Sequence, residues 1–178
     1  MTGWRPGQRR ADRASMLRVD QAGEYGATRI YAGQLAVLRA NCPEAKLISR
    51  MAAQEQRHLQ RFDRLIAERR VRPTALQPLW NVAGFALGAA TALMSEEAAL
   101  ACTDAVETEI DRHYGRQLDE LGEDDPELAA DIAEFRAEEL EHRDTARAAG
   151  ATNAVGYPLL TTAIRAGCKM AIALSKRI

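Results

Sequence analysis

Two short motifs in this sequence place a carboxylate and an imidazole on the same face of a helix. Glu55-Gln-Arg-His58 and Glu139-Leu-Glu-His142 both have the spacing Glu-x-x-His, and together they use two of the three histidines in the chain. Residues i and i+3 of an α-helix lie side by side, so both side chains of each pair can reach the same ion. The pattern indicates a metal-binding half-site in each half of the chain.

Two further glutamates extend this pattern. Glu24 lies 31 residues before Glu55, and Glu107 lies 32 residues before Glu139, so both halves repeat one order of side chains. One Glu from each of two helices, with one Glu-x-x-His from each of two others, is the ligand arrangement of di-iron carboxylate bundles. Four carboxylates balance the charge of two divalent cations. Oxygen and imidazole donors without a thiolate favour iron or manganese, although zinc also fits.

The six residues interrupt apolar helical stripes, which predicts that they are buried. Glu107, for example, lies on the same helix face as Thr103 and Ile110. An isolated buried carboxylate is costly and is normally neutralised by a proton. Four carboxylates that converge in one core therefore require cations.

The helices that must position these residues follow from apolar periodicity and from Pro and Gly breaks. Short turns join the first helix to the second and the fourth to the fifth, and a link of about 25 residues joins the two pairs. This connectivity predicts an all-α, ferritin-like four-helix bundle with a crossover helix and a C-terminal helix. The expected helices span about 15–40, 44–70, 79–94, 96–121 and 126–149, and from 159 to the C-terminus.

Composition supports one compact domain, expected at 15–178 after a basic N-terminal arm at 1–14. The chain has 178 residues, 47% of them hydrophobic, which excludes global disorder. Its net charge of -1 gives no reason to expect a nucleic-acid partner. Three cysteines without a CxxC spacing form neither a disulfide framework nor a zinc ribbon. The N-terminal residues have no apolar stretch typical of a secretory signal.

Two features indicate contact with a membrane surface. Segment 79–94 is apolar nearly all round and contains Gly84-x-x-x-Gly88, but it is too short to span a bilayer. Both ends of the chain are basic, and the C-terminal helix carries Arg165, Lys169 and Lys176. Such helices can rest in a membrane interface. The alternatives are solvated basic tails, and apolar helices buried against the bundle or against the second subunit of a homo-oligomer.

Longer motifs carry a resemblance to a known family. The segment Leu17-Arg-Val-Asp-Gln-Ala-Gly-Glu24-Tyr-Gly-Ala, with Arg29-Ile-Tyr-Ala-Gly-Gln34, closely resembles the opening of the demethoxyubiquinone hydroxylase family. Glu138-Glu139-Leu-Glu-His142-Arg-Asp and Ala166-Gly-Cys-Lys fit the same family, and the resemblance covers the chain from about 17 to 178. One departure is Gln21, where family members often have His. That position is not an expected metal ligand.

The resemblance implies an O2-dependent monooxygenase that hydroxylates the ring of a polyprenyl demethoxyubiquinol in ubiquinone biosynthesis. It also implies a peripheral location on a membrane, at the cytoplasmic face of a bacterial inner membrane or the matrix face of a mitochondrial one. A lipid-binding partner protein of the same pathway is implied as well. By resemblance Glu55 and Glu139 bridge two iron ions, and the full set of iron ligands is Glu24, Glu55, His58, Glu107, Glu139 and His142.

Electrons for this reaction must come from outside the chain. The sequence has no Gly-x-Gly-x-x-Gly motif after a strand and no cysteine set for an iron–sulfur cluster. The resemblance suggests NADH as the ultimate donor. His113 and Tyr114 are candidates for an electron or proton relay, because Tyr114 lies seven residues after Glu107 on the same helix face. The alternatives are a core aromatic residue for Tyr114 and a surface histidine for His113. Tyr25, next to Glu24, is a weaker candidate.

Two other functions are compatible with a di-iron bundle. One is a ferritin-like ferroxidase or iron-storage protein, which would form a soluble cage. The other is a soluble di-iron hydroxylase that acts on a nucleoside in RNA. The apolar segment 79–94 and the first family motif favour the quinol hydroxylase.

Overall fold

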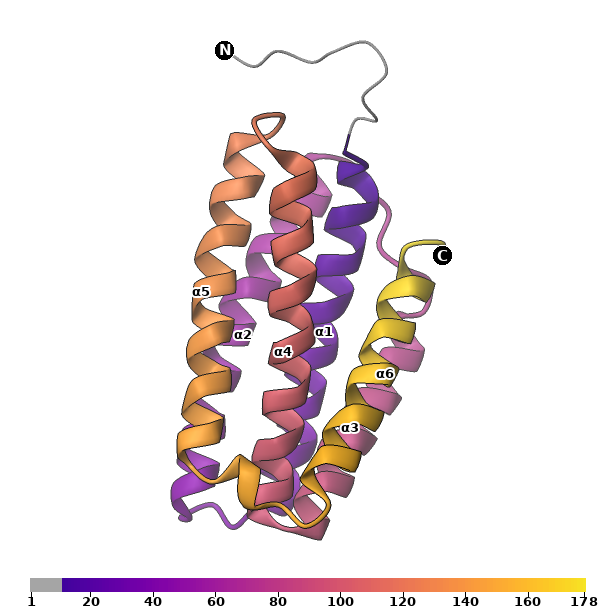
Figure 1. Cartoon of the computed structure of the whole chain (residues 1–178). Coiled ribbons are helices and arrows are strands. Elements are labelled where there is room, and N and C mark those ends of the chain that lie inside the picture. Colours follow the sequence, from indigo (N-terminus) through magenta and orange to yellow (C-terminus); the bar gives the residue numbers. More distant parts are fainter. Residues whose placement is uncertain (1–10) are drawn as a thin grey trace.

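The computed structural model describes residues 11–178, and this part of the chain consists of six α-helices and one short 3-10 helix, without a strand (Figure 1). The predicted all-α class is therefore confirmed. Each expected helix is present, with ends that differ by at most three residues, whereas the 3-10 helix was not expected. The elements are α1 (Arg13–Val37), α2 (Pro43–Glu68), α3 (Gln77–Met94), α4 (Glu96–Leu121), α5 (Pro126–Ala148), η1 (Ala151–Asn153) and α6 (Tyr157–Ser175).

Local signals set the ends of several helices. The Ser95 hydroxyl accepts a hydrogen bond from the Ala98 N–H at 3.0 Å and caps α4. Asp125 caps α5 by accepting from the Leu128 N–H at 3.2 Å, directly before Pro126. After α5, Gly150 has φ 110°, a conformation that favours glycine.

The expected N-terminal arm at 1–14 falls mostly on residues 1–10, which lie outside the described part. Its last residues belong to the bundle instead, because α1 begins at Arg13. Asp12 provides the reason, since its carboxylate accepts a hydrogen bond from the Ser15 N–H at 3.1 Å and caps the helix.

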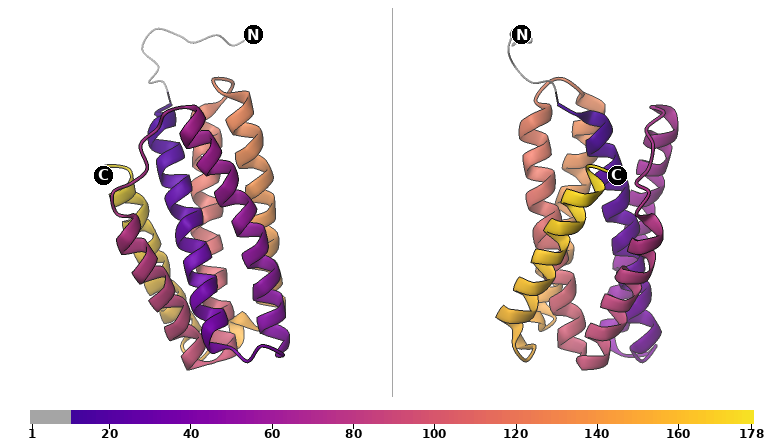
Figure 2. Two further views of the ribbon diagram at one scale, coloured as in Figure 1. Left: turned by 180° about the vertical axis from the view of Figure 1, so that it is seen from behind. Right: turned by 90° about the vertical axis from the view of Figure 1, so that its right-hand side faces the viewer.

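Helices α1, α2, α4 and α5 form the bundle as two antiparallel pairs, α1 with α2 and α4 with α5 (Figures 1 and 2). Helix α3, within the long link, packs mainly on α1 and also on α4. Helix α6 packs mainly on α4. Both additional helices thus lie outside the bundle, on the side formed by α1 and α4. No helix in the described part of the chain has the length and apolar character needed to cross a membrane.

Two apolar clusters occupy opposite ends of the bundle core. One includes Tyr31, Ile48 and Leu100, and the other includes Phe62 and Leu128. Along each of the four bundle helices, the predicted metal-binding residues lie between positions of these two clusters. The predicted metal-binding residues therefore lie between two apolar clusters of the core.

Helix α3 approaches α1 so closely that a side chain would clash with backbone at two glycines of the contact and would be tight at a third. A Cβ atom added at Gly88 would lie 1.9 Å from the backbone oxygen of Ile30, and one at Gly33 would lie 2.1 Å from the backbone oxygen of Phe85. At Gly84 the nearest atoms would lie 3.0 Å away, again on α1. The pair Gly84-x-x-x-Gly88 thus lies in the close contact of α3 with α1.

Candidate metal centre

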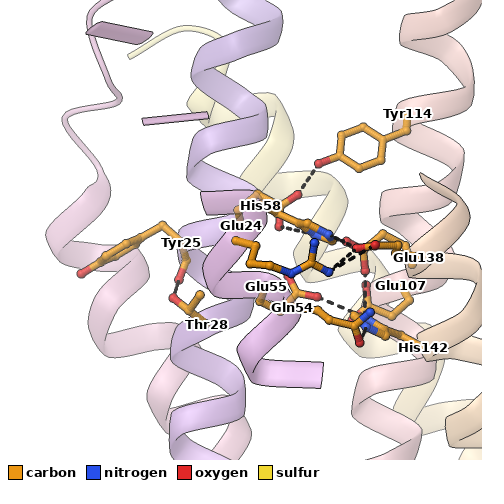
Figure 3. Close-up of polar contacts among 12 residues, drawn as sticks. Glu24, Tyr25, Thr28, Gln54, Glu55, His58, Glu107, Tyr114, Glu138 and His142 are labelled. Atoms are coloured by element: carbon orange, nitrogen blue, oxygen red, sulfur yellow. Dashed lines mark hydrogen bonds and ion pairs between the residues drawn. The ribbon is translucent and has the colours of Figure 1, made fainter. Parts of the chain in front are cut away.

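All six predicted ligand residues converge at mid-height of the bundle. Glu24 comes from α1, Glu55 and His58 from α2, Glu107 from α4, and Glu139 and His142 from α5. None of the six is more than 2% exposed. Figure 3 shows the labelled members of this set turned toward one another between the helices. The predicted burial of these side chains is therefore correct.

Their ligand atoms form two overlapping groups, each with atoms within 4.8 Å of one another. The first group contains Glu24, Glu55, His58 and Glu139, and the second contains Glu55, Glu107, Glu139 and His142. Only Glu55 and Glu139 belong to both groups, which is the placement that two bridging carboxylates need. Ligation itself, and the bridging roles, remain predictions.

The donor atoms of this cluster fit a pair of cations because six of them, all buried, have no hydrogen-bond partner. A buried polar atom without a hydrogen bond costs about 1–3 kcal/mol. Here the atoms without a hydrogen bond are Glu24 Oε2, both carboxylate oxygens of Glu55, His58 Nδ1, Glu107 Oε2 and Glu139 Oε1. Two divalent ions would provide partners for all of them and would balance the charge of the four carboxylates.

The cluster has a strong affinity for protons when no metal is bound. Burial, together with the neighbouring carboxylates, raises the pKa of Glu55, of Glu107 and of Glu139. Burial lowers the pKa of His58, but the carboxylates of Glu139 and Glu24 outweigh it and raise that pKa to about 11. Metal ions compete with these protons, so metal uptake should release protons and weaken at low pH.

Both imidazoles present Nδ1 to the cluster and Nε2 to an outer partner. His58 Nδ1 lies 3.0 Å from Glu139 Oε1, and His58 Nε2 lies 2.5 Å from Glu138 Oε2. His142 Nδ1 lies 3.1 Å from Glu55 Oε1, and its Nε2 lies 2.9 Å from Gln54 Oε1. Metal-binding histidines are typically held in this way by a second hydrogen bond.

The outer partners Gln54 and Glu138 were missed in the sequence analysis. A signal for them exists, because each directly precedes the glutamate of a Glu-x-x-His motif. Which histidine each one contacts depends on how α2 and α5 face each other across the core.

Two tyrosines hold the remaining glutamates in a crossed arrangement. The Tyr114 hydroxyl on α4 donates a hydrogen bond to Glu24 on α1, as Figure 3 shows. The Tyr31 hydroxyl on α1 donates to Glu107 on α4 at 2.8 Å. Each tyrosine lies seven residues after the glutamate of its own helix and contacts the glutamate of the other. Tyr31 was not among the site residues predicted from the sequence, although the repeated spacing of seven residues could have identified it.

The structure separates the other relay candidates from the metal centre. His113 is buried, which excludes the alternative of a surface histidine, and its Nε2 lies 3.1 Å from Asp20 Oδ1. Its ring lies 6.1 Å from that of Tyr114, so it reaches the cluster only through neighbours. The Tyr25 ring points away from the cluster (Figure 3).

The bundle and its buried Glu and His side chains define the class of ferritin-like carboxylate metalloproteins. Comparison with known proteins identifies the family within this class. The family model described as "Ubiquinone biosynthesis protein COQ7" matches residues 11–175, and the chain belongs to this family.

Curated relatives agree with this assignment. The chain is 57% identical over 162 residues to a "3-demethoxyubiquinol 3-hydroxylase" of Rhodospirillum rubrum, covering 91% of this chain and 76% of the relative. It is 54% identical to the mitochondrial "NADPH-dependent 3-demethoxyubiquinone 3-hydroxylase" of Mus musculus, with the same coverage. It is 44% identical to the mitochondrial "5-demethoxyubiquinone hydroxylase" of Saccharomyces cerevisiae, over 92% of this chain and 77% of the relative.

Proposed function

We propose that this protein is an O2-dependent di-iron monooxygenase that hydroxylates the ring of a polyprenyl demethoxyubiquinol in ubiquinone biosynthesis. The observation that carries the proposal is the buried set of six side chains whose ligand atoms converge in two overlapping groups, five of them with an atom that lacks a hydrogen bond. Family membership supports the substrate, because relatives that match nine tenths of this chain are named as demethoxyubiquinol or demethoxyubiquinone hydroxylases.

The chain's own residues hold and shield the centre. Glu24 and His58 would bind one ion, Glu107 and His142 would bind the other, and the remaining two glutamates would be shared. When bound, iron supplies the redox chemistry that activates O2. The two apolar clusters on either side exclude water from the centre, and the two tyrosine hydroxyls orient the unshared glutamates.

We propose a reduced nicotinamide nucleotide as the external electron donor. The resemblance seen in the sequence suggested NADH, whereas the names of the mouse and human relatives specify NADPH. Parallel assays with each nucleotide distinguish these two donors.

The function is tested with metal-free protein reconstituted with Fe(II) under nitrogen. The reconstituted protein receives a short-chain demethoxyubiquinol, a reduced nicotinamide and 18O2. We expect the quinol product to gain one labelled hydroxyl oxygen, detected by mass spectrometry. Accumulation of a ferric mineral without quinol hydroxylation would instead favour the ferritin-like alternative.

Exposed apolar side chains support peripheral contact with a membrane, where a polyprenyl substrate resides. The most exposed are Leu79, Val82, Leu93 and Met94 on α3, and Leu159, Met170 and Ile178 on and after α6. Both helices lie on the same side of the bundle (Figure 2). The alternative to membrane contact is that a second copy of the chain, or a lipid-binding partner protein, binds to this surface.

Two basic residues of α6 that the sequence suggested for lipid contact form ion pairs within the protein instead. Arg165 Nε lies 2.7 Å and Lys169 Nζ 3.9 Å from the buried carboxylate of Glu109 on α4. A charge reversal at either position would therefore disturb the packing of α6 as well as any lipid contact. Apolar positions of α3 are the cleaner probe of membrane binding.

We expect the double variant Val82→Asp, Leu93→Asp to lose binding to anionic liposomes, because both side chains are exposed on α3. Wild-type protein should float with the liposomes in a density gradient at low salt. The matched control Ala133→Asp, Ala137→Asp places the same charges on exposed positions of α5 and should float like the wild type. Wild-type protein that stays at the bottom of the gradient would contradict membrane contact.

We expect Tyr114→Phe to reduce turnover by about tenfold, a barrier increase of about 1.4 kcal/mol. The change keeps the ring in its buried position and removes only the hydroxyl that contacts Glu24. A purely structural hydrogen bond would instead cost about 0.5–1.5 kcal/mol of stability and leave turnover unchanged. Iron content, melting temperature and hydroxylation are measured on one preparation. Tyr31→Phe is the matched variant, because its hydroxyl makes the equivalent contact with Glu107.

A further inference from the structure

The two histidines of the cluster are supported by outer partners that differ in charge. Helices α2 and α5 contribute equivalent positions, since the residue before each motif glutamate contacts the histidine of the opposite helix. His58 is supported by the carboxylate of Glu138 at 2.5 Å, and His142 is supported by the neutral amide of Gln54 at 2.9 Å. Figure 3 shows both contacts. The arrangement is symmetric in position and asymmetric in charge.

The other residues around the two half-sites do not offset the difference in charge between Glu138 and Gln54. Glu24 and Glu107 each accept one tyrosine hydroxyl, so the unshared carboxylates have the same kind of partner. Glu55 and Glu139 belong to both groups and favour neither. The outer partner of each histidine is thus the clearest difference between the two half-sites.

Arg57 reduces the effect of Glu138 but does not remove it. One guanidinium nitrogen of Arg57 lies 3.2 Å from both carboxylate oxygens of Glu138. The Arg57 side chain is 55% exposed, against 23% for Glu138 and 0% for His58. Water screens the exposed cation more than it screens the contact between Glu138 and the buried imidazole.

We infer that the half-site formed by Glu24 and His58 binds a divalent ion more tightly than the half-site formed by Glu107 and His142, and that it fills first. A carboxylate that accepts the outer N–H of a histidine makes the opposite nitrogen a stronger donor to a metal, and loss of such a partner typically costs about 10–100-fold in metal affinity. A neutral amide gives a weaker effect. The inference rests on the proposed metal centre and adds an order of filling to it.

The order of filling is tested by adding one equivalent of Co²⁺ per chain to metal-free protein under nitrogen. Crystals of this complex, measured at the cobalt absorption edge, give the occupancy of each half-site. We expect most of the cobalt beside Glu24 and His58. Equal occupancy, or a preference for the side of His142, would overturn the inference.

Two variants, each of which removes one charge, separate charge from structure. Glu138→Gln keeps a hydrogen-bond acceptor for His58 but removes the charge, and should weaken the first step of a Co²⁺ titration by about tenfold. Arg57→Gln removes the counter-ion of Glu138 and should leave the first step as tight or tighter. A merely structural contact between α2 and α5 predicts that both variants weaken binding alike, which would also overturn the inference.

Saturation with Co²⁺ distinguishes this inference from the proposed function. Fewer than two ions per chain at saturation would refute the di-metal centre itself, and the order of filling with it. Two ions per chain with no preference at one equivalent, or with Glu138→Gln unchanged from wild type, would refute only the order of filling.

Discussion

Replacing Glu139 by Ala is expected to abolish metal binding in both halves of the centre. Glu139 is one of only two residues that belong to both groups of ligand atoms, and it is fully buried. Iron content should fall from about two per chain toward zero, and hydroxylation by at least about a thousandfold, or about 4 kcal/mol in barrier. Iron analysis and the 18O2 assay measure the two losses.

His142→Ala provides a graded comparison, because His142 belongs to only one group. It should retain one iron per chain and lose turnover. Glu141→Ala is the matched control, since this exposed glutamate lies on the same helix and outside both groups. Full iron content in the Glu139→Ala or His142→Ala protein would remove that residue from the ligand set.

Misfolding is a separate explanation for lost iron, and the charge of the cluster argues against it. Burial raises the pKa of Glu55 and of Glu107, and the neighbouring carboxylate of Glu139 raises both further, so these charges repel one another when no cation is present. Removing the carboxylate of Glu139 relieves part of this repulsion. Metal-free Glu139→Ala protein should therefore melt no lower than metal-free wild type, as measured by circular dichroism.

Gly88→Ala is expected to be the most destabilising single methyl addition in the close contact of α1 with α3. The new Cβ atom would lie 1.9 Å from the backbone oxygen of Ile30, and backbone atoms within a helix cannot move aside as the end of a flexible side chain can. The helices must separate, at a cost of about 2–4 kcal/mol in the free energy of unfolding. Urea unfolding of the metal-free protein measures this loss.

Gly167→Ala on α6 is the control, and we expect it to raise the free energy of unfolding rather than lower it. No atom lies within 4 Å of the Cβ position at Gly167, so alanine gains its helical preference without a clash. The expected change is a stabilisation of about 0.5–1 kcal/mol. A Gly88→Ala protein that is as stable as the wild type would show that α3 can shift on α1 without cost.

The helices and the ligand set could be predicted from the sequence because both depend on local spacing. Two residues three positions apart share a helix face whatever the rest of the chain does, so Glu55 with His58 and Glu139 with His142 were recognisable as pairs. Caps such as Ser95 and Asp125 act within their own first turn. The helix ends that these caps set could therefore be predicted without knowing any contact between helices.

Contacts between helices could not be predicted in the same way. The hydroxyl of Tyr114 contacts Glu24 rather than the glutamate of its own helix, and His113 contacts Asp20. Arg165, expected to be free for lipid contact, pairs with the buried Glu109. Each of these contacts depends on the rotation and axial register of one helix against another, which packing of the whole core decides.

Helical periodicity alone places four carboxylates and two histidines on the core faces of four helices, so this much could be predicted from spacing. That these faces meet at one height depends on how the helices pack against one another. The same packing brings Glu55 and Glu139 to where both groups overlap, and lets Glu138 and Gln54 support the two histidines with different charge. The physical reason is range: a spacing of three or seven residues is set by the geometry of one helix, whereas the position of one helix along another is set by side-chain packing over the full length of the bundle.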